Sequence, residues 1–188
     1  MNLPNKLTLL RVFLIPVFLV FLLIESIPYN YFWALSVFAI ASITDALDGY
    51  IARKNHLVTN FGKFLDPLAD KVLVMAAIIA FIELKFVSCI PVIIILGREF
   101  MVTSLRLIAN KSGGKVIAAG LMGKLKTAFT MVAIIVIMGL QGFVKAGVSF
   151  QFDTILVGEI LMWIATAITL ISGIQYLWDY RTEIDPTK

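Results

Sequence analysis

Four aspartates in two pairs stand out in a chain that is otherwise mostly apolar. Asp45 and Asp48 are three residues apart, and Asp66 and Asp70 are four apart. Residues three or four apart on a helix share a face, so each pair directs two carboxylates to one side. Carboxylates brought together repel one another unless they are protonated or bind cations, and their hard oxygen atoms suit Mg²⁺ or Mn²⁺. Two such ions would fit a phosphoryl-transfer site.

Asp66 also has a purely structural interpretation. It is followed by Pro67, and an aspartate N-cap with proline at the first helical position is a common way to begin a helix. We therefore expect a helix to begin at Pro67. Capping does not explain Asp70, Asp45 or Asp48.

The composition indicates an integral membrane protein with a single domain over residues 1–188. The chain is 60% hydrophobic and 15% charged, with a mean hydropathy of +0.96, whereas soluble domains are roughly 45–50% apolar and about 25% charged. One cysteine and one histidine exclude an internal disulfide and make a Cys/His site a poor interpretation. The net charge of +4 does not indicate nucleic-acid binding, because the basic residues border apolar stretches.

The hydropathy pattern predicts an all-α fold with six transmembrane helices. A spanning helix needs about 20 mostly apolar residues. The first stretch is followed by further spans and by no small-residue cleavage site, so we treat it as a helix rather than a signal peptide. The expected spans are residues 8–26, 31–51, 67–84, 89–109, 121–143 and 154–178.

The basic residues predict the orientation. If both termini are cytoplasmic, fourteen lysines and arginines lie at cytoplasmic ends and loops, and only Lys85 and Lys145 lie outside. This asymmetry follows the positive-inside rule. It also places the four aspartates on the cytoplasmic side. The cytoplasmic set is Lys6, Arg11, Arg53, Lys54, Lys63, Lys71, Arg98, Arg106, Lys111, Lys115, Lys124, Lys126, Arg181 and Lys188.

Arg98 and Glu99 lie at an unexpected depth. The uncharged stretch from Phe86 to Gly97 rises about 18 Å as a helix, against a hydrocarbon core of about 30 Å. Charges inside the membrane cost on the order of 3 kcal/mol each, so they are candidates for function. For Lys126, in contrast, we expect a side chain that extends to the membrane interface.

The acidic stretch resembles the signature of the CDP-alcohol phosphatidyltransferase family, D-x2-D-G-x2-A-R-x8-G-x3-D-x3-D. Every fixed position and every gap fits. The resemblance implies six transmembrane helices, a homodimer and an active site at the cytoplasmic face of the bacterial cell membrane. The matching residues are Asp45, Asp48, Gly49, Ala52, Arg53, Gly62, Asp66 and Asp70.

The resemblance also implies roles for these residues. The four aspartates would hold two divalent ions, Mg²⁺ or Mn²⁺, and Asp70 would also be the general base. The substrate would be CDP-diacylglycerol, a membrane lipid. Glycine allows a nucleotide to approach the backbone closely, and arginine can pair with phosphate. The positions implied for CDP binding are Asp45, Gly49, Ala52, Arg53, Thr59 and Gly62.

Further segments resemble one branch of the family, the bacterial phosphatidylglycerophosphate synthases. They are NLPNKLTLLR at the start, GREFMVTSLR from Gly97 and GKLKT from Gly123. This branch implies glycerol 3-phosphate as the acceptor, and a phosphorylated acceptor needs cations. Arg98 and Arg106 are eight residues apart and share a helix face. The expected acceptor-phosphate residues are Arg11, Arg98, Arg106 and Lys124.

Three alternatives remain open on sequence alone. The first is a sibling enzyme with another acceptor, such as inositol phosphate. The second is a cation transporter that uses the carboxylates as an ion path, although the acidic residues near the opposite face form no evident chain across the membrane. The third is a prenyltransferase, which would leave the Gly-x2-Ala-Arg stretch unexplained.

Overall fold

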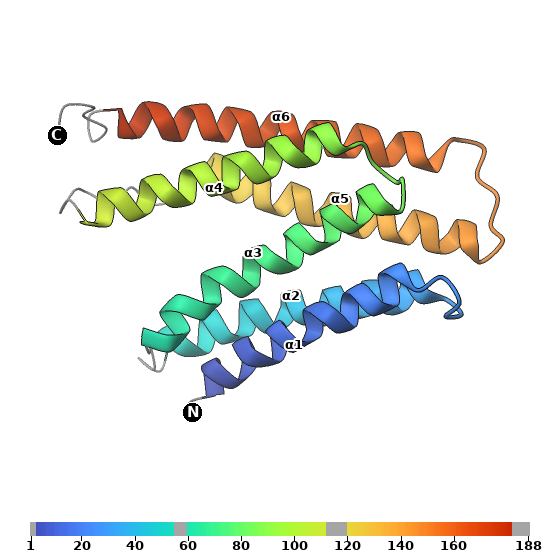
Figure 1. Cartoon of the computed structure of the whole chain (residues 1–188), viewed down its shortest axis with the longest axis horizontal. Coiled ribbons are helices and arrows are strands. Elements are labelled where there is room, and N and C mark those ends of the chain that lie inside the picture. Colours follow the sequence, from blue (N-terminus) through green and yellow to red (C-terminus); the bar gives the residue numbers. More distant parts are fainter. Residues whose placement is uncertain (1–2, 55–59, 112–119, 182–188) are drawn as a thin grey trace. The chain divides into compact units, whose positions relative to one another are not determined.

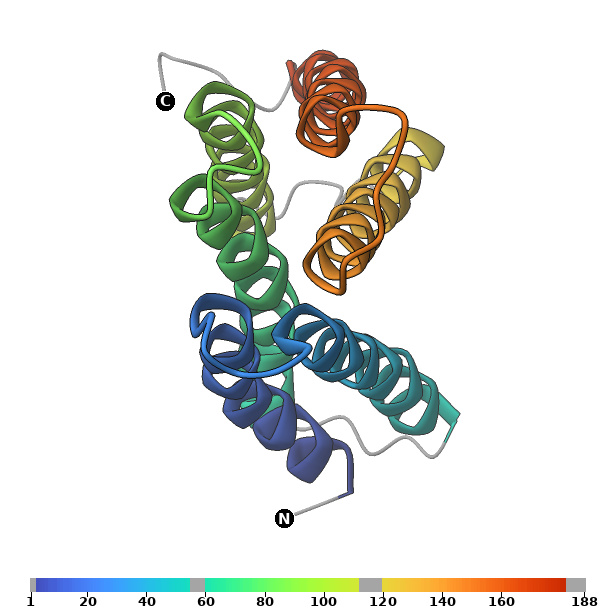
Figure 2. The same ribbon diagram turned by 90° about the vertical axis from the view of Figure 1, so that its right-hand side faces the viewer.

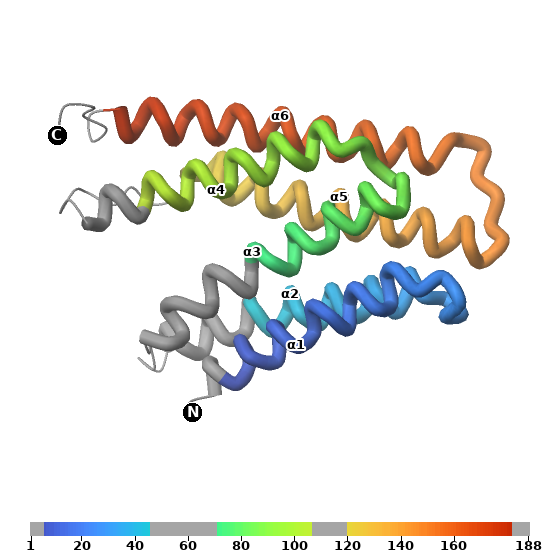
Figure 3. Tube along the Cα trace, in the orientation of Figure 1, coloured from blue at the N-terminus to red at the C-terminus, as the bar shows by residue number. Residues whose placement is uncertain are grey.

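The computed structural model describes residues 3–54, 60–111 and 120–181, and within them the side chains of residues 6–45, 71–106 and 120–181 (Figure 3). It is all-helical in these ranges, and each of the six predicted helices is present (Figure 1). Their bounds are α1 Leu3–Leu23, α2 Asn30–Lys54, α3 Asn60–Glu83, α4 Cys89–Lys111, α5 Leu121–Lys145 and α6 Thr154–Tyr180.

The start of the third helix corrects one expectation. We expected a helix to begin at Pro67 with Asp66 as its N-cap, but α3 begins at Asn60. Asp66 therefore lies inside the helix and cannot cap it. The helix spans Asp66 and Asp70 together, as α2 spans Asp45 and Asp48. Both aspartate pairs thus have the helical spacing on which the predicted cation site depends.

Three helices, among the described residues, are long and apolar enough to cross a membrane. They are α1 over Lys6–Leu23, α5 over Leu121–Lys145 and α6 over Thr154–Tyr180. The six crossings and the cytoplasmic placement of both termini remain predictions.

The chain divides into two compact units. Unit 1 contains residues 1–85 and 134–154, and unit 2 contains residues 86–133 and 155–188. The two units share α5, whose first half belongs to unit 2 and whose second half belongs to unit 1. The expectation of a single domain stays a prediction.

Unit 1 has its core where α1, α2 and α3 contact one another. The antiparallel helices α1 and α2 lie side by side (Figure 1, Figure 2). Phe18 of α1 and Phe38 of α2 are fully buried, with ring centroids 5.7 Å apart. Ile78 and Phe81 of α3 are also fully buried. In a water-soluble protein, burial of a side chain of this size stabilises the fold by about 1.5–3 kcal/mol. Between helices in lipid, close packing of the side chains provides the stabilisation instead.

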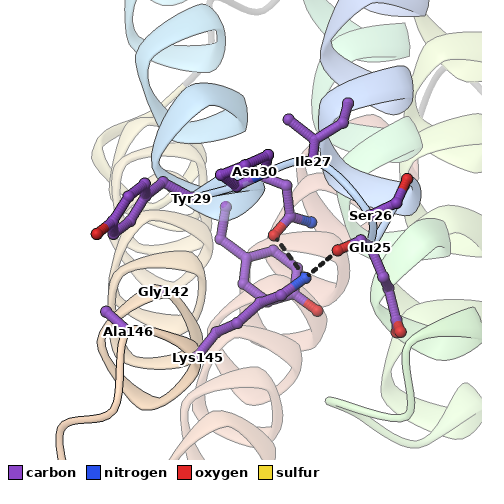
Figure 4. Close-up of a pocket in the computed structure, with 10 residues that line it drawn as sticks. Glu25, Ser26, Ile27, Tyr29, Asn30, Gly142, Lys145 and Ala146 are labelled. Carbon is purple, nitrogen blue, oxygen red and sulfur yellow. Dashed lines mark hydrogen bonds between the residues drawn. The ribbon is translucent and has the colours of Figure 1, made fainter.

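Lys145 joins the end of α5 to the connection between α1 and α2. Its Nζ donates to the backbone carbonyl of Glu25 at 2.7 Å and to Asn30 Oδ1 at 3.0 Å (Figure 4). The ammonium also lies 5.2 Å from the centroid of the Tyr31 ring. These groups line an open cavity of about 370 Å³. Lys145 is exposed, and its charge is thus held by protein oxygens and an aromatic ring at the surface. A positive charge in the last turn of α5 also interacts favourably with the free carbonyl groups at this end of the helix.

Unit 2 contains a second set of contacts, in which α6 is the common element. At one end, Glu159 of α6 accepts hydrogen bonds from the backbone N–H and the hydroxyl of Ser88, just before α4 begins. Toward the other end, Tyr176 and Tyr180 stack with ring centroids 4.6 Å apart, and Val102 of α4 packs against both. The helix α4 is therefore fixed to α6 at two levels.

Replacing Lys145 with methionine should lower stability, because Asn30 Oδ1 and the Glu25 carbonyl would lose a charged donor. We expect a loss of about 1 kcal/mol, the usual net value of a hydrogen bond, measured as a lower midpoint of thermal unfolding in detergent. Lys85→Met is the matched control, since Lys85 is the other predicted outside lysine and is exposed. Equal midpoints for the two variants would contradict this function of Lys145.

Candidate active site

The aspartate pairs lie on two consecutive helices of unit 1. Asp45 and Asp48 belong to the last part of α2, and Asp66 and Asp70 belong to the first half of α3. Lys54 and Asn60 bound the connection between these helices, and the extended chain between them spans at most about 20 Å. The helices also contact each other. The backbone thus brings both pairs to the same end of unit 1, as the cation site requires.

Most predicted CDP-binding residues lie on the same helices. Gly49, Ala52 and Arg53 belong to α2, and Gly62 belongs to α3. Thr59 lies outside the described residues, and the described side chains in unit 1 do not include those of Asp48, Arg53, Asp66 or Asp70. The roles assigned to these residues stay predictions.

Asp45 has a described partner on α1. Arg11 Nη1 lies 2.6 Å from Asp45 Oδ1, and the exposed fractions of the two side chains are 0% and 37%. A guanidinium with no exposed surface needs a counter-charge, because burial of an unpaired charge is costly. Asp45 supplies it and still presents part of its carboxylate to the surroundings. Sequence spacing gave no sign of this pair, because the two residues are 34 positions apart and on different helices.

Arg11 was expected to bind the acceptor phosphate. The structure describes a different contact for it, the ion pair with Asp45. That contact places Arg11 beside a predicted metal ligand and CDP-binding residue. Its role toward the acceptor stays a prediction.

Arg98 of α4 is a buried cation held by two polar groups. It is 7% exposed, its Nη2 donates to Ser172 Oγ of α6 at 2.8 Å, and its Nη1 lies 3.2 Å from Glu99 Oε1. The same Glu99 oxygen accepts from Lys126 of α5. The expectation that Lys126 extends to the interface is therefore wrong, because Lys126 is largely buried against this carboxylate.

Arg106 is held by an uncharged aromatic side chain. Its Nε donates to the Tyr176 hydroxyl at 3.4 Å, and its guanidinium carbon lies 5.9 Å from the centroid of the Tyr176 ring. Lys124, the remaining predicted acceptor residue, lies in the first turn of α5 and is exposed. Unit 2 thus combines two predicted acceptor cations, Arg98 and Arg106, along one face of α4 against α6.

Sequence reasoning missed the residues that hold these cations. Ser172 and Tyr176 were not assigned to the site, although they contact Arg98 and Arg106. Glu99 was a candidate for function because of its depth, but its contact with Arg98 was not predicted. One signal was present in the sequence. Ser172 and Tyr176 are polar residues four apart in an otherwise apolar span, the spacing that puts both on one helix face.

Comparison with known proteins identifies the family. The family model described as CDP-alcohol phosphatidyltransferase matches residues 1–171. The chain belongs to the CDP-alcohol phosphatidyltransferase family.

The curated relatives indicate a branch of this family. A protein of Bacillus subtilis (strain 168) is 43% identical over 186 residues, covering 93% of each chain. A protein of Rickettsia bellii is also 43% identical, over 93% of each chain. One from Pseudomonas fluorescens is 38% identical, over 94% of this chain and 89% of its own. All three carry the name CDP-diacylglycerol–glycerol-3-phosphate 3-phosphatidyltransferase.

The ion pair between Arg11 and Asp45 should be measurable in a double-mutant cycle of Arg11→Met and Asp45→Asn. We expect a coupling energy above about 1 kcal/mol, the upper value for exposed pairs, because one partner is fully buried. Unfolding of the two single variants and the double variant in mixed micelles provides the measurement. Additive effects of the two substitutions would show that the pair contributes nothing.

Proposed function

We propose that this protein transfers the phosphatidyl group of CDP-diacylglycerol to glycerol 3-phosphate, forming phosphatidylglycerophosphate and releasing CMP. The observation that carries the proposal is the 43% identity, over 93% of both chains, to a curated relative named for this reaction. The four helical aspartates and the two arginines held by α6 support it, because the reaction needs a site for a diphosphate and a site for a phosphorylated acceptor.

The donor set in unit 1 fits hard divalent cations. It consists of carboxylates in pairs of helical spacing on α2 and α3, and the Asp45 carboxylate is partly accessible. We propose that Asp45, Asp48, Asp66 and Asp70 hold two ions, Mg²⁺ or Mn²⁺. When bound, such ions supply positive charge that stabilises the developing charge on the diphosphate.

Residues of the chain carry out the proton transfer and bind the nucleotide. Asp70 accepts the proton of the carbon-1 hydroxyl of glycerol 3-phosphate. The hydroxyl oxygen forms a bond to the β-phosphorus of CDP-diacylglycerol while the bond from that phosphorus to the oxygen bridging to CMP breaks. Arg53 pairs with a phosphate of the nucleotide, and Gly49 and Gly62 allow its close approach to the backbone. No covalent enzyme intermediate is required.

The membrane placement follows from the substrate. The acyl chains of CDP-diacylglycerol stay in the bilayer, so we propose a multi-pass protein of the bacterial cell membrane with its site at the cytoplasmic headgroup level. The excess of basic residues on that side supports this orientation. Lys145, one of the two exceptions, has its charge held by protein oxygens. We also propose a homodimer, as the family resemblance implies.

The proposal is tested with purified protein, CDP-diacylglycerol and a panel of acceptors. We expect CMP release with glycerol 3-phosphate and Mg²⁺ or Mn²⁺, little release with inositol phosphate, and none with EDTA. Asp70→Asn should abolish turnover while leaving the protein folded in the membrane. Turnover of inositol phosphate with glycerol 3-phosphate inert would indicate the sibling enzyme, and metal-dependent ion flux without CMP release would indicate a transporter.

Arg98→Ala should weaken use of the acceptor more than use of the lipid. Loss of a charge-assisted hydrogen bond should raise the KM for glycerol 3-phosphate by about tenfold or more. The KM for CDP-diacylglycerol should stay within about twofold. An unchanged KM for the acceptor would remove Arg98 from the phosphate site.

A further inference from the structure

The helix α6 contacts both predicted acceptor arginines through side chains that were not part of the predicted site. Ser172 Oγ accepts from Arg98 at 2.8 Å, and the Tyr176 hydroxyl accepts from Arg106 at 3.4 Å. All four side chains are in unit 2. Ser172 is 4% exposed and Tyr176 is 7% exposed, so both hydroxyl groups come from buried side chains, although Arg106 itself is exposed.

The spacing of these contacts draws the two guanidinium groups toward each other. Arg98 and Arg106 are eight residues apart on α4, a rise of about 12 Å, whereas Ser172 and Tyr176 are four apart on α6, a rise of about 6 Å. The two long side chains therefore converge on α6 from more widely separated backbone positions. An anion that lies between two positive charges is attracted to both and offsets their repulsion.

Gly173 provides the space that Arg98 occupies. A Cβ at this position would lie 3.0 Å from Arg98 Cγ and 3.6 Å from Arg98 Nε. Arg98 Cγ would have to move by a few tenths of an ångström, while the guanidinium is held by Ser172 and Glu99. Glycine at 173 therefore favours the observed position of Arg98.

Arg98 still has bonding capacity in this position. Its Nε is buried and has no hydrogen-bond partner among the described residues. Its Nη1 lies beside the carboxylate of Glu99, which also accepts from Lys126. A phosphate has oxygen atoms that can accept a hydrogen bond from this guanidinium and a negative charge that can pair with it.

We propose that Ser172, Gly173 and Tyr176 of α6 are positioning residues that hold Arg98 and Arg106 together as a two-arginine clamp for the acceptor's phosphate. The proposal rests on the proposed function and adds that helix α6 determines which acceptor the enzyme uses. In this view α6 does not touch the acceptor. It sets where the two guanidinium groups lie, and through them it favours a phosphorylated alcohol over an uncharged one.

The test compares Gly173→Ala, Ser172→Ala and Tyr176→Phe with wild type by measuring kcat and both KM values in detergent-solubilised protein. Gly173→Ala should raise the KM for glycerol 3-phosphate by about tenfold, as expected for a displaced charge-assisted hydrogen bond. Tyr176→Phe should raise it by a few fold, because the ring remains. The KM for CDP-diacylglycerol should stay within about twofold. Ser172→Thr keeps the hydroxyl and should restore most of what Ser172→Ala loses.

Matched controls lie in unit 1. Gly139→Ala adds a Cβ to a helical glycine with no heavy atom within 4 Å, and Ser36→Ala removes an exposed hydroxyl that bonds only to its own helix, at Phe32 O. Both should leave the KM for glycerol 3-phosphate unchanged. A general effect of packing would lower the unfolding midpoint and change both KM values together, and that result would overturn the proposal.

The outcomes also separate this proposal from the proposed function. If wild type consumes a different phosphorylated alcohol, the proposed function fails, and the same comparison of KM values on that acceptor still tests the clamp. If wild type consumes only an alcohol without phosphate, both fail. If glycerol 3-phosphate is the acceptor and its KM is insensitive to all three α6 positions, only the clamp is wrong.

Discussion

A charge buried in an apolar helix bundle has to be balanced or bonded by protein groups, and this requirement shapes both units of the chain. Arg11 has no exposed surface and Arg98 is 7% exposed, yet each meets a carboxylate. Each also has a partner on another helix. Arg11 forms an ion pair with Asp45 of α2, and Arg98 donates a hydrogen bond to Ser172 of α6. In both cases the buried guanidinium specifies which helix face lies against which, because a rotated helix would leave the charge without its partners.

The same requirement applies to charged groups near helix ends. Lys145, in the last turn of α5, is held by carbonyl and amide oxygens. Glu159, near the start of α6, accepts hydrogen bonds from Ser88 and from Trp163 Nε1, the latter at 2.9 Å. The core of unit 1 consists of side chains such as Phe18, Phe38 and Ile78, which need no partner of opposite charge.

Hydropathy alone was enough to predict the six helices, because a run of about 20 apolar residues is a property of the local sequence. It could not place the start of α3. The Asp66–Pro67 pair favours a helix start locally, but the helix extends back to Asn60 and includes the aspartate.

Contacts between residues far apart in the sequence could also not be predicted from the sequence. The pairing of Lys126 with Glu99 joins residues 27 positions apart on different helices, and hydropathy favoured an interfacial position for this lysine. The aspartate signature, in contrast, was readable because its eight fixed positions lie within 26 residues.

The three arginines differ in the kind of group that holds them, and this difference bears on what each can do. Arg11 is balanced by the carboxylate of Asp45. Arg98 lies beside Glu99, a carboxylate that also accepts from Lys126. Arg106 is held by the hydroxyl and ring of Tyr176, which are neutral. A neutral support fixes a guanidinium without cancelling its charge, which is the property that an anion-binding arginine needs. The polar face of α6 therefore suits it to hold cations for a substrate, whereas Asp45 suits α2 to hold Arg11 for the fold.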